Sequence, residues 1–216
     1  LYSSLGLDLE GLSLEEINNG FIETGLGFIY QPNHFPLAEK LISYREEIGK
    51  RPPLASMELL WTAHQGEHLH VSGYVHNPTE ERHWQTLKLL KEFNSITVKG
   101  LEGSTDLPIS KKSLIGKITK DGNERININP RNYNYFGKDI TLECLQEWKR
   151  QAFEALENKG PLKKSLLWNA GVYLWLAGSA ENIEEGLFKA ESLIQSGLVK
   201  STLKKLIDWR KQLIKY

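Results

Sequence analysis

The chain has 216 residues, of which 40% are hydrophobic and 25% charged, a composition typical of a soluble globular protein with one large or two small domains. Lysine plus arginine and aspartate plus glutamate number 27 each, so the zero net charge argues against bulk electrostatic binding of nucleic acid or anionic membrane. The single cysteine, Cys144, excludes an internal disulfide and a cysteine-built zinc site, and is typical of a reducing compartment.

Two sequence features bear on the compartment of the protein. No opening stretch has the layout of a signal peptide, and the longest apolar run, residues 166–178, is shorter than the ~20 residues of a membrane span and contains Asn169. These features predict a cytoplasmic protein without a membrane segment. Because the chain starts at Leu1 in LYSSLGLDL, without an initiator methionine, we expect it to be part of a longer protein.

The first sixty residues are predicted to be mainly helical. Ser13 and Glu16 form an S-x-x-E capping box, which marks the start of a helix. The apolar run LGFIY before Pro32 predicts a short buried strand, and Pro36 suits the first turn of a helix. The predicted elements are helices over residues 13–23, 36–48 and 51–61 and a strand over residues 26–30.

The middle of the chain predicts strands and the last third predicts helices. From Leu69 apolar and polar residues alternate, and the turn KDGN joins two runs of strand type, which is a hairpin signal. The predicted strands cover residues 68–76, 95–100, 113–119 and 124–130, with a helix over 79–93. Helices are predicted over 142–155, 162–176, 183–196 and 202–214, with Gly197 as a left-handed C-cap. We interpret the aromatic residues of the second of these helices, Trp168, Tyr173 and Trp175, as core. This order predicts an α/β fold.

The sequence HQGEH that begins at His64 spells H-x-x-E-H, the order used by one class of zinc peptidases. A helix is needed there to bring both imidazoles to one zinc, whereas Gly66 lowers helix propensity and strand alternation begins at His68. On a strand, residues four apart lie about 13 Å apart, too far for a shared zinc. His68 and His70 would share a face, but two ligands do not make a site. We therefore interpret this stretch as a polar strand face.

Four longer segments occur in an order that resembles a known family. They are LGLDLEGLSLEEINNGFIETGLGFIYQPNHFPLAEKLISYREEIGKR, VKGLEGSTD, NPRNYNYFG and ENKGPLKKSLLWNAGVYLWLAGSAENIEEGLFKAESLIQSG. Together they resemble anthranilate phosphoribosyltransferases, of glycosyltransferase family 3, over residues 1–206, with the weakest likeness across 53–75. The resemblance implies an α/β fold of the nucleoside phosphorylase/phosphoribosyltransferase type, with a mixed β-sheet domain, flanking helices and helices of a smaller α domain. Residues 1–52 would be the helical segment of the α domain, and 53–216 the C-terminal part of the α/β domain.

The resemblance also implies an activity. This family transfers a phosphoribosyl group from phosphoribosyl pyrophosphate to an aromatic amine, with Mg²⁺ on the pyrophosphate, and its helical domain forms a homodimer. The resemblance does not identify the acceptor substrate of this chain. The family's pyrophosphate loop, Gly-Thr-Gly-Gly-Asp, and its Lys-His-Gly-Asn-Arg segment have no counterpart in these 216 residues. Because that loop supplies backbone N–H groups to the phosphates, we expect no turnover by this chain alone.

Two residues of the amino-terminal part are candidates for substrate binding. The resemblance implies that Arg45 clamps a carboxylate of the acceptor, for which a bidentate guanidinium is suited. The alternative is a surface arginine that pairs with Glu39 or Glu46. His34 matches the first of two family histidines in the acceptor pocket, whereas Phe35 replaces the second.

Asp106 is the candidate metal ligand. By gap-free count the family's Asp-Glu pair falls on Thr105 and Asp106, and with a slip of one residue it falls on Asp106 and Leu107. Either match loses one carboxylate, and Mg²⁺ sites depend on carboxylates and substrate phosphates. The alternative is a turn aspartate that caps the backbone. The family's Pro-x-Arg-Asp helix start also loses its charge pattern, since it becomes Pro161-Leu162-Lys163-Lys164 here.

A rival hypothesis is a non-catalytic scaffold of the same fold that binds nucleic acid or a protein partner. It would need a basic face, and lysines on amphipathic helices are more often simply solvated. The candidate residues are Lys88, Lys91, Lys99, Lys111, Lys112, Lys117, Lys200, Lys204, Lys205, Arg210 and Lys211. The zero net charge argues against nucleic acid without excluding a local patch.

Overall fold

The computed structural model describes residues 2–49 and 57–213, and the chain divides into two compact units. Unit 1 comprises Leu1–Lys50, Thr141–Lys163 and Glu191–Tyr216, and unit 2 comprises Arg51–Ile140 and Lys164–Ala190. Across the described residues, every helix is too short or too polar to cross a lipid bilayer. Each unit has its own hydrophobic core.

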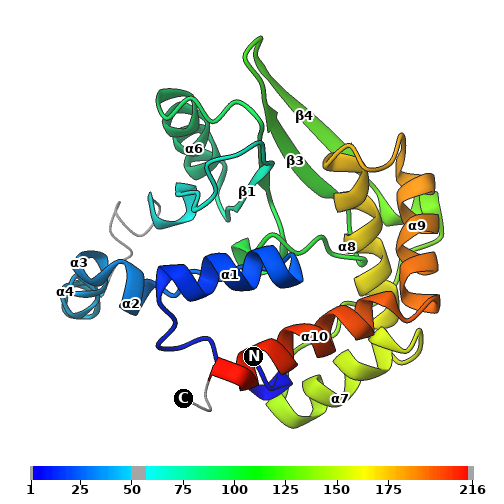
Figure 1. The fold of residues 1–216 in the computed structure, drawn as a ribbon. Helices are drawn as coiled ribbons and strands as arrows, with labels where there is room; N and C mark the ends of the chain where they lie inside the picture. Colours follow the sequence, from blue (N-terminus) through cyan, green and yellow to red (C-terminus); the bar gives the residue numbers. More distant parts are fainter. Residues whose placement is uncertain (1, 50–56, 214–216) are drawn as a thin grey trace. The chain divides into compact units, whose positions relative to one another are not determined.

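Unit 2 is built on a four-stranded mixed sheet in the order β1-β2-β3-β4 (Figure 1). The strands are β1 (His70–Gly73), β2 (Ser95–Val98), β3 (Ser113–Ile118) and β4 (Asn123–Ile128). β1 and β2 are parallel and joined by helix α6 (Asn77–Leu89), whereas β2, β3 and β4 pair antiparallel. Because parallel strands end at the same edge, the carboxyl ends of β1 and β2 lie next to each other.

Helices cover both faces of this sheet. Side chains alternate between the two faces along each strand, and apolar side chains lie on both faces. On one face lie α8 (Lys163–Leu176) and the first part of α9 (Ile183–Gln195). The apolar core there consists of Ile96, Val98, Leu107, Ile109, Ile115, Ile128, Trp168, Val172, Ile183 and Leu187. On the other face α6 packs through Leu87 and Trp84 against Ile118, together with Leu60. Figure 1 shows α6 and α8 on opposite sides of the sheet.

Short 3₁₀ turns complete unit 2, and helices make up unit 1. The 3₁₀ turns of unit 2 are η2 (Glu58–Leu60), η3 (Leu101–Gly103) and η4 (Pro130–Tyr133). Unit 1 contains η1 (Ser3–Leu5), α1 (Leu14–Thr24), α2 (Gln31–His34), α3 (Pro36–Glu39), α4 (Ile42–Ile48), α7 (Leu145–Leu156) and α10 (Leu198–Leu213). Its core consists of Leu7, Leu12, Ile17, Leu206 and Trp209, so α1 and α10 pack on each other.

The α/β class with a mixed sheet is confirmed, as are several local predictions. Ser13 accepts from the Glu16 backbone N–H while the Glu16 carboxylate accepts from the Ser13 N–H, which is the predicted capping box. Gly197 has a left-handed φ of 73° directly after α9. The hairpin of β3 and β4 and the four C-terminal helices also occur where the sequence predicts them, within a few residues. Trp168 is fully buried, which agrees with its interpretation as a core residue.

Two predictions about residues 26–48 are wrong. The run LGFIY forms no strand, and Leu26, Ile29 and Tyr30 are exposed on a connection into α2. A strand needs a neighbouring strand for its backbone hydrogen bonds, and unit 1 offers none within its described residues. The helix predicted over 36–48 is two helices, α3 and α4, separated by Lys40 and Leu41. Of the helix predicted over 51–61, residues 51–56 lie outside the described part, and the remainder contains η2.

Candidate functional site

The segment that follows β2 forms a turn at the carboxyl edge of the parallel strands. We call residues 100–106 the acidic turn, because it contains Glu102 and Asp106. Its ends are joined by a hydrogen bond from the Leu101 N–H to the Asp106 carbonyl at 3.1 Å. Within it the Ser104 hydroxyl accepts from the Asp106 N–H at 3.1 Å and donates to the Asp106 carboxylate at 3.3 Å. The turn is therefore a closed loop, and both carboxylates are exposed on it.

The acidic turn packs closely on the end of β1. A Cβ atom placed on Gly73, the last residue of β1, would collide with backbone atoms of Gly103 and Ser104. Only glycine allows two backbones to approach so closely. In open α/β sheets the crevice outside the carboxyl ends of the strands is the usual ligand site. This edge is therefore the candidate functional site of unit 2.

Helix α8 contacts the acidic turn from its other side. The Tyr173 hydroxyl donates to the carbonyl of Thr105 at 2.5 Å. Burial raises the pKa of Tyr173 to about 12, and the nearby Asp106 carboxylate contributes in the same direction. The hydroxyl is therefore protonated and able to donate over the whole physiological pH range.

Asp106 is the sequence-predicted metal ligand, and it lies at the candidate site with its side chain exposed. Thr105, the residue before Asp106, offers a hydroxyl and has its carbonyl engaged by Tyr173. Within residues 2–49 and 57–213, no three His, Cys, Asp or Glu side chains gather as a protein-built metal centre would require. The donor set at this edge suits a Mg²⁺ ion that brings most of its ligands as water and phosphate oxygens.

His34 and Arg45 lie in unit 1. The His34 Nε2 is 2.8 Å from the carbonyl of Leu12, and its Nδ1 accepts from the Tyr30 N–H at 3.0 Å. Both ring nitrogens therefore join backbone segments of unit 1. Arg45 is half-buried on α4 and its side chain takes part in interactions within the chain. Their roles in acceptor binding stay predictions.

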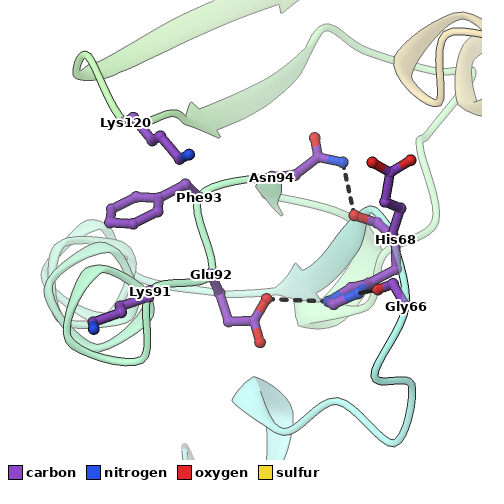
Figure 2. A pocket seen from close by; sticks show the side chains of 8 residues that line it. Gly66, His68, Lys91, Glu92, Phe93, Asn94 and Lys120 are labelled. Atoms are coloured by element: carbon purple, nitrogen blue, oxygen red, sulfur yellow. Dashed lines mark hydrogen bonds and ion pairs between the residues drawn. The ribbon is translucent and has the colours of Figure 1, made fainter.

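The histidine stretch lines a hollow of about 530 Å³ at the opposite edge of the sheet (Figure 2). His68 is fixed there by two acceptors, since its Nδ1 lies 2.7 Å from the Gly66 carbonyl and its Nε2 lies 3.0 Å from the Glu92 carboxylate. His64 and His68 pack edge to face, with ring centroids 6.0 Å apart. β1 begins at His70, two residues later than predicted, so His64 and His68 lie on an irregular segment before the strand.

One residue that contacts the candidate site, and to which sequence reasoning assigned no role, is Asn169. In the sequence it is only the polar residue that interrupts an apolar run, whereas in the structure its amide binds the backbone of Leu107, next to Asp106. Tyr173 lies four residues further on, and i, i+4 spacing places both on one face of α8. The spacing was visible in the sequence, but the segment that this face meets was not.

A family model described as "Glycosyl transferase family, a/b domain" matches residues 1–200. Among curated proteins, the anthranilate phosphoribosyltransferase of Aromatoleum aromaticum is 25% identical over 214 residues, which cover 97% of this chain and 62% of that protein. The chain thus spans less than two thirds of the length of this relative.

Two solved structures have the same fold as this chain. Anthranilate phosphoribosyltransferase from Saccharomyces cerevisiae in complex with 4-fluoroanthranilate matches with a TM-score of 0.85 and 18% identity, covering 98% of this chain and 62% of that one. The same yeast protein in complex with PRPP and Mg matches with a TM-score of 0.84 and 16% identity, over the same shares.

Proposed function

The chain belongs to the glycosyl transferase family whose a/b domain model matches residues 1–200, and from this membership we propose that it is part of a pentosyltransferase that uses phosphoribosyl pyrophosphate. In the proposed reaction the bond between ribose C1 and the pyrophosphate oxygen breaks, and its electron pair leaves with the pyrophosphate. A nucleophilic atom of the acceptor then bonds to C1 and releases a proton. A protein promotes such a reaction mainly by positioning the reactants and stabilising the leaving charge.

The observation that supports this proposal best is the acidic turn at the carboxyl edge of β1 and β2. Asp106 is exposed there, on a loop closed by its own hydrogen bonds and packed against Gly73. A related yeast protein has been solved in complex with PRPP and Mg. We propose that Asp106 contributes a carboxylate to Mg²⁺ carried by the pyrophosphate, and that this ion, when bound, neutralises charge on the leaving group.

The acceptor of the proposed reaction is an amine that we leave unidentified. Anthranilate-type acceptors carry a carboxylate, and Arg45 on α4 offers the guanidinium that binds this group best. We propose Arg45 and His34 as acceptor-binding residues of unit 1. The ring nitrogens of His34 already bind the carbonyl of Leu12 and the N–H of Tyr30. His34 would therefore contribute to acceptor binding through contact with the face of its ring.

Calorimetry of phosphoribosyl pyrophosphate with Mg²⁺ tests the proposal, using the complete gene product that contains these residues. We expect binding that requires Mg²⁺, weakened about tenfold or more by Asp106→Asn, since a charge-assisted contact contributes about 1.5–3 kcal/mol. Asp121→Asn, at an exposed aspartate in the turn between β3 and β4, is the matched control and should bind like wild type. Absence of any binding by wild type would contradict the transferase proposal.

We also propose a second copy of the chain as partner and the cytoplasm as compartment, where the exposed thiol of Cys144 stays free. Unit 1 exposes large apolar side chains, including Leu14 (64%), Ile22 (73%) and Leu37 (78%), which a contact with a second copy would bury. Sedimentation should show a dimer that Ile22→Lys dissociates. The control Leu89→Lys, at a residue 84% exposed on α6, should leave it intact.

The rival scaffold function draws little support from α10, where several of its basic residues are engaged in unit 1. Lys200 pairs with Glu157 at 2.5 Å, and Lys205 donates to the Glu23 carbonyl. Arg210 is buried and donates to the carbonyls of Asp8 and Glu10. A salt-dependent mobility shift of DNA, together with no binding of phosphoribosyl pyrophosphate, would favour the rival.

A further inference from the structure

One face of α8 binds the backbone on both sides of Asp106. The Tyr173 hydroxyl donates to the carbonyl of Thr105 at 2.5 Å. The Asn169 side chain accepts from the Leu107 N–H at 2.7 Å and donates to the Leu107 carbonyl at 3.0 Å, as a neighbouring strand would. The residues before and after Asp106 are therefore fixed, while the Asp106 side chain itself is exposed.

The same pattern continues one step further along the chain. The Ile109 N–H donates to the Asp139 carboxylate at 2.8 Å, and the Ile109 carbonyl accepts from the Gly137 N–H at 3.0 Å. Leu107 and Ile109 are buried in the core of unit 2. The backbone groups of residues 105, 107 and 109 thus form hydrogen bonds with α8 or with residues 137–139, although this segment belongs to no strand of the sheet. The conformation of the segment therefore depends on these contacts.

The Asn169 amide is itself held in place. Its nitrogen also donates to the Ser165 carbonyl at 2.9 Å, one turn earlier on α8. This contact, together with the two to Leu107, fixes which end of the amide carries the oxygen. A leucine at position 169 could fill the same space on the helix. It would leave the buried N–H and carbonyl of Leu107 without hydrogen-bond partners, and this loss of free energy is larger than the net contribution of a typical hydrogen bond.

We propose that Asn169 and Tyr173 are positioning residues, which hold the backbone of residues 105–107 so that Asp106 is presented at the carboxyl edge of β1 and β2 for the magnesium pyrophosphate group. The ligand in this inference rests on the proposed function, whereas the clamp is a property of the chain alone. Removing the clamp should loosen the acidic turn first, and should weaken binding of the metal-bound ligand as a consequence.

Hydrogen exchange of backbone amides in the 216-residue chain tests the clamp directly. Tyr173→Phe removes one hydroxyl and should speed exchange at Leu101 and Leu107 about tenfold, while the thermal midpoint stays close to wild type. Tyr133→Phe is the matched control, because Tyr133 packs on Trp168 in the same core with ring centroids 5.7 Å apart. Asn169→Ala is the second variant and should speed exchange further at Leu107. Unchanged exchange in both variants, or an equal increase in the control, would overturn the clamp.

Calorimetry with Mg²⁺ and phosphoribosyl pyrophosphate tests the consequence, on the complete gene product. Tyr173→Phe should weaken Mg²⁺-dependent binding about three- to tenfold, while Tyr133→Phe binds like wild type. Equal binding by Tyr173→Phe, in spite of faster exchange, would overturn the positioning role. If wild type binds no phosphoribosyl pyrophosphate, the proposed function fails, and the exchange data still decide whether the clamp exists.

Discussion

At the scale of single residues, the buried charge of Glu80 is the most consequential feature outside the candidate site. Glu80 is a residue of α6, and its carboxylate is fully buried. This carboxylate accepts hydrogen bonds from Arg125 at 2.7 Å and from the Thr97 hydroxyl at 3.1 Å. The hydrogen bond to Glu80 raises the pKa of Arg125. Removing one partner of such a pair leaves a buried charge without compensation, which costs more than the pair itself contributes.

We therefore predict that Arg125→Met lowers the free energy of unfolding by about 2–3 kcal/mol, measured by urea denaturation. The control is Lys117→Met in the same hairpin. It breaks an exposed pair with Glu124 at 3.6 Å and should cost less than about 1 kcal/mol. Similar losses for the two variants would contradict the argument.

The pH dependence of stability should reflect His70, whose buried Nδ1 has no hydrogen-bond partner among the residues that the structure describes. Burial lowers the pKa of His70 below its ordinary value of 6.5, an effect that outweighs the Glu92 carboxylate, which raises it. Below pH 6.5 the unfolded chain takes up a proton that the folded chain does not bind, so stability falls as the pH falls, until the folded pKa is reached.

The expected result is a urea midpoint that drops between pH 7.5 and pH 5.5, and that drops less in His70→Gln. His76→Gln is the control, because His76 is exposed, and it should follow wild type. An identical drop in His70→Gln would show that another group is responsible.

At the scale of elements, the crossing of α1 and α10 depends on Gly20. A Cβ at this position would lie 2.5 Å from the Trp209 ring. Alanine favours helices over glycine by about 1 kcal/mol, so Gly20→Ala would stabilise an isolated helix. In the protein we predict the opposite sign, a net loss of about 1–3 kcal/mol, because the core must shift.

Asn19→Ala is the matched control for this prediction, since Asn19 is the exposed neighbour of Gly20 on α1. It gains helix propensity without any clash and should be neutral or slightly stabilising. Thermal unfolding followed by circular dichroism measures both variants. A stabilised Gly20→Ala protein would show that α1 and α10 do not pack as described.

The start of α1 offers a second test at this scale. Ser13→Ala removes the side-chain acceptor of the capping box and should cost about 1 kcal/mol. Hydrogen exchange should then quicken in the first turn of α1. The control Ser43→Ala removes only a hydroxyl of α4 that lies 3.4 Å from the carbonyl of Lys40, so exchange in α1 should not change. Faster exchange with both variants would mean that the effect is not local to the cap.

At the scale of the whole molecule, we expect the proposed activity to require a phosphate-binding loop. These 216 residues contain no counterpart of Gly-Thr-Gly-Gly-Asp. Backbone N–H groups of such a loop bind phosphate oxygens that a single carboxylate with Mg²⁺ cannot replace. We predict no release of pyrophosphate from phosphoribosyl pyrophosphate by this chain with anthranilate as acceptor. Turnover above the rate without protein would contradict this prediction.

The candidate site was only partly predictable from the sequence. Asp106 was singled out because the turn VKGLEGSTD resembles the family segment that carries an acidic pair, and such an ordered motif can be matched within one short stretch of sequence. Asn169 and Tyr173 were not assigned a role, because their partners lie 62 and 68 residues away in the chain. A helix pattern shows which residues share a face, but the sequence does not state which loop that face will meet.

The sequence alone determined the features that depend on neighbouring residues. The capping box at Ser13, the left-handed Gly197, the hairpin turn between β3 and β4 and the family membership all follow from short-range chemistry or from ordered motifs. Tertiary structure decided the rest. LGFIY is apolar enough for a strand, but the described residues of unit 1 offer no strand for it to pair with. Around His64 and His68, the described residues gather no group of three potential metal ligands. Strand pairing and metal sites need groups that are distant in the chain, and only the folded backbone brings such groups together.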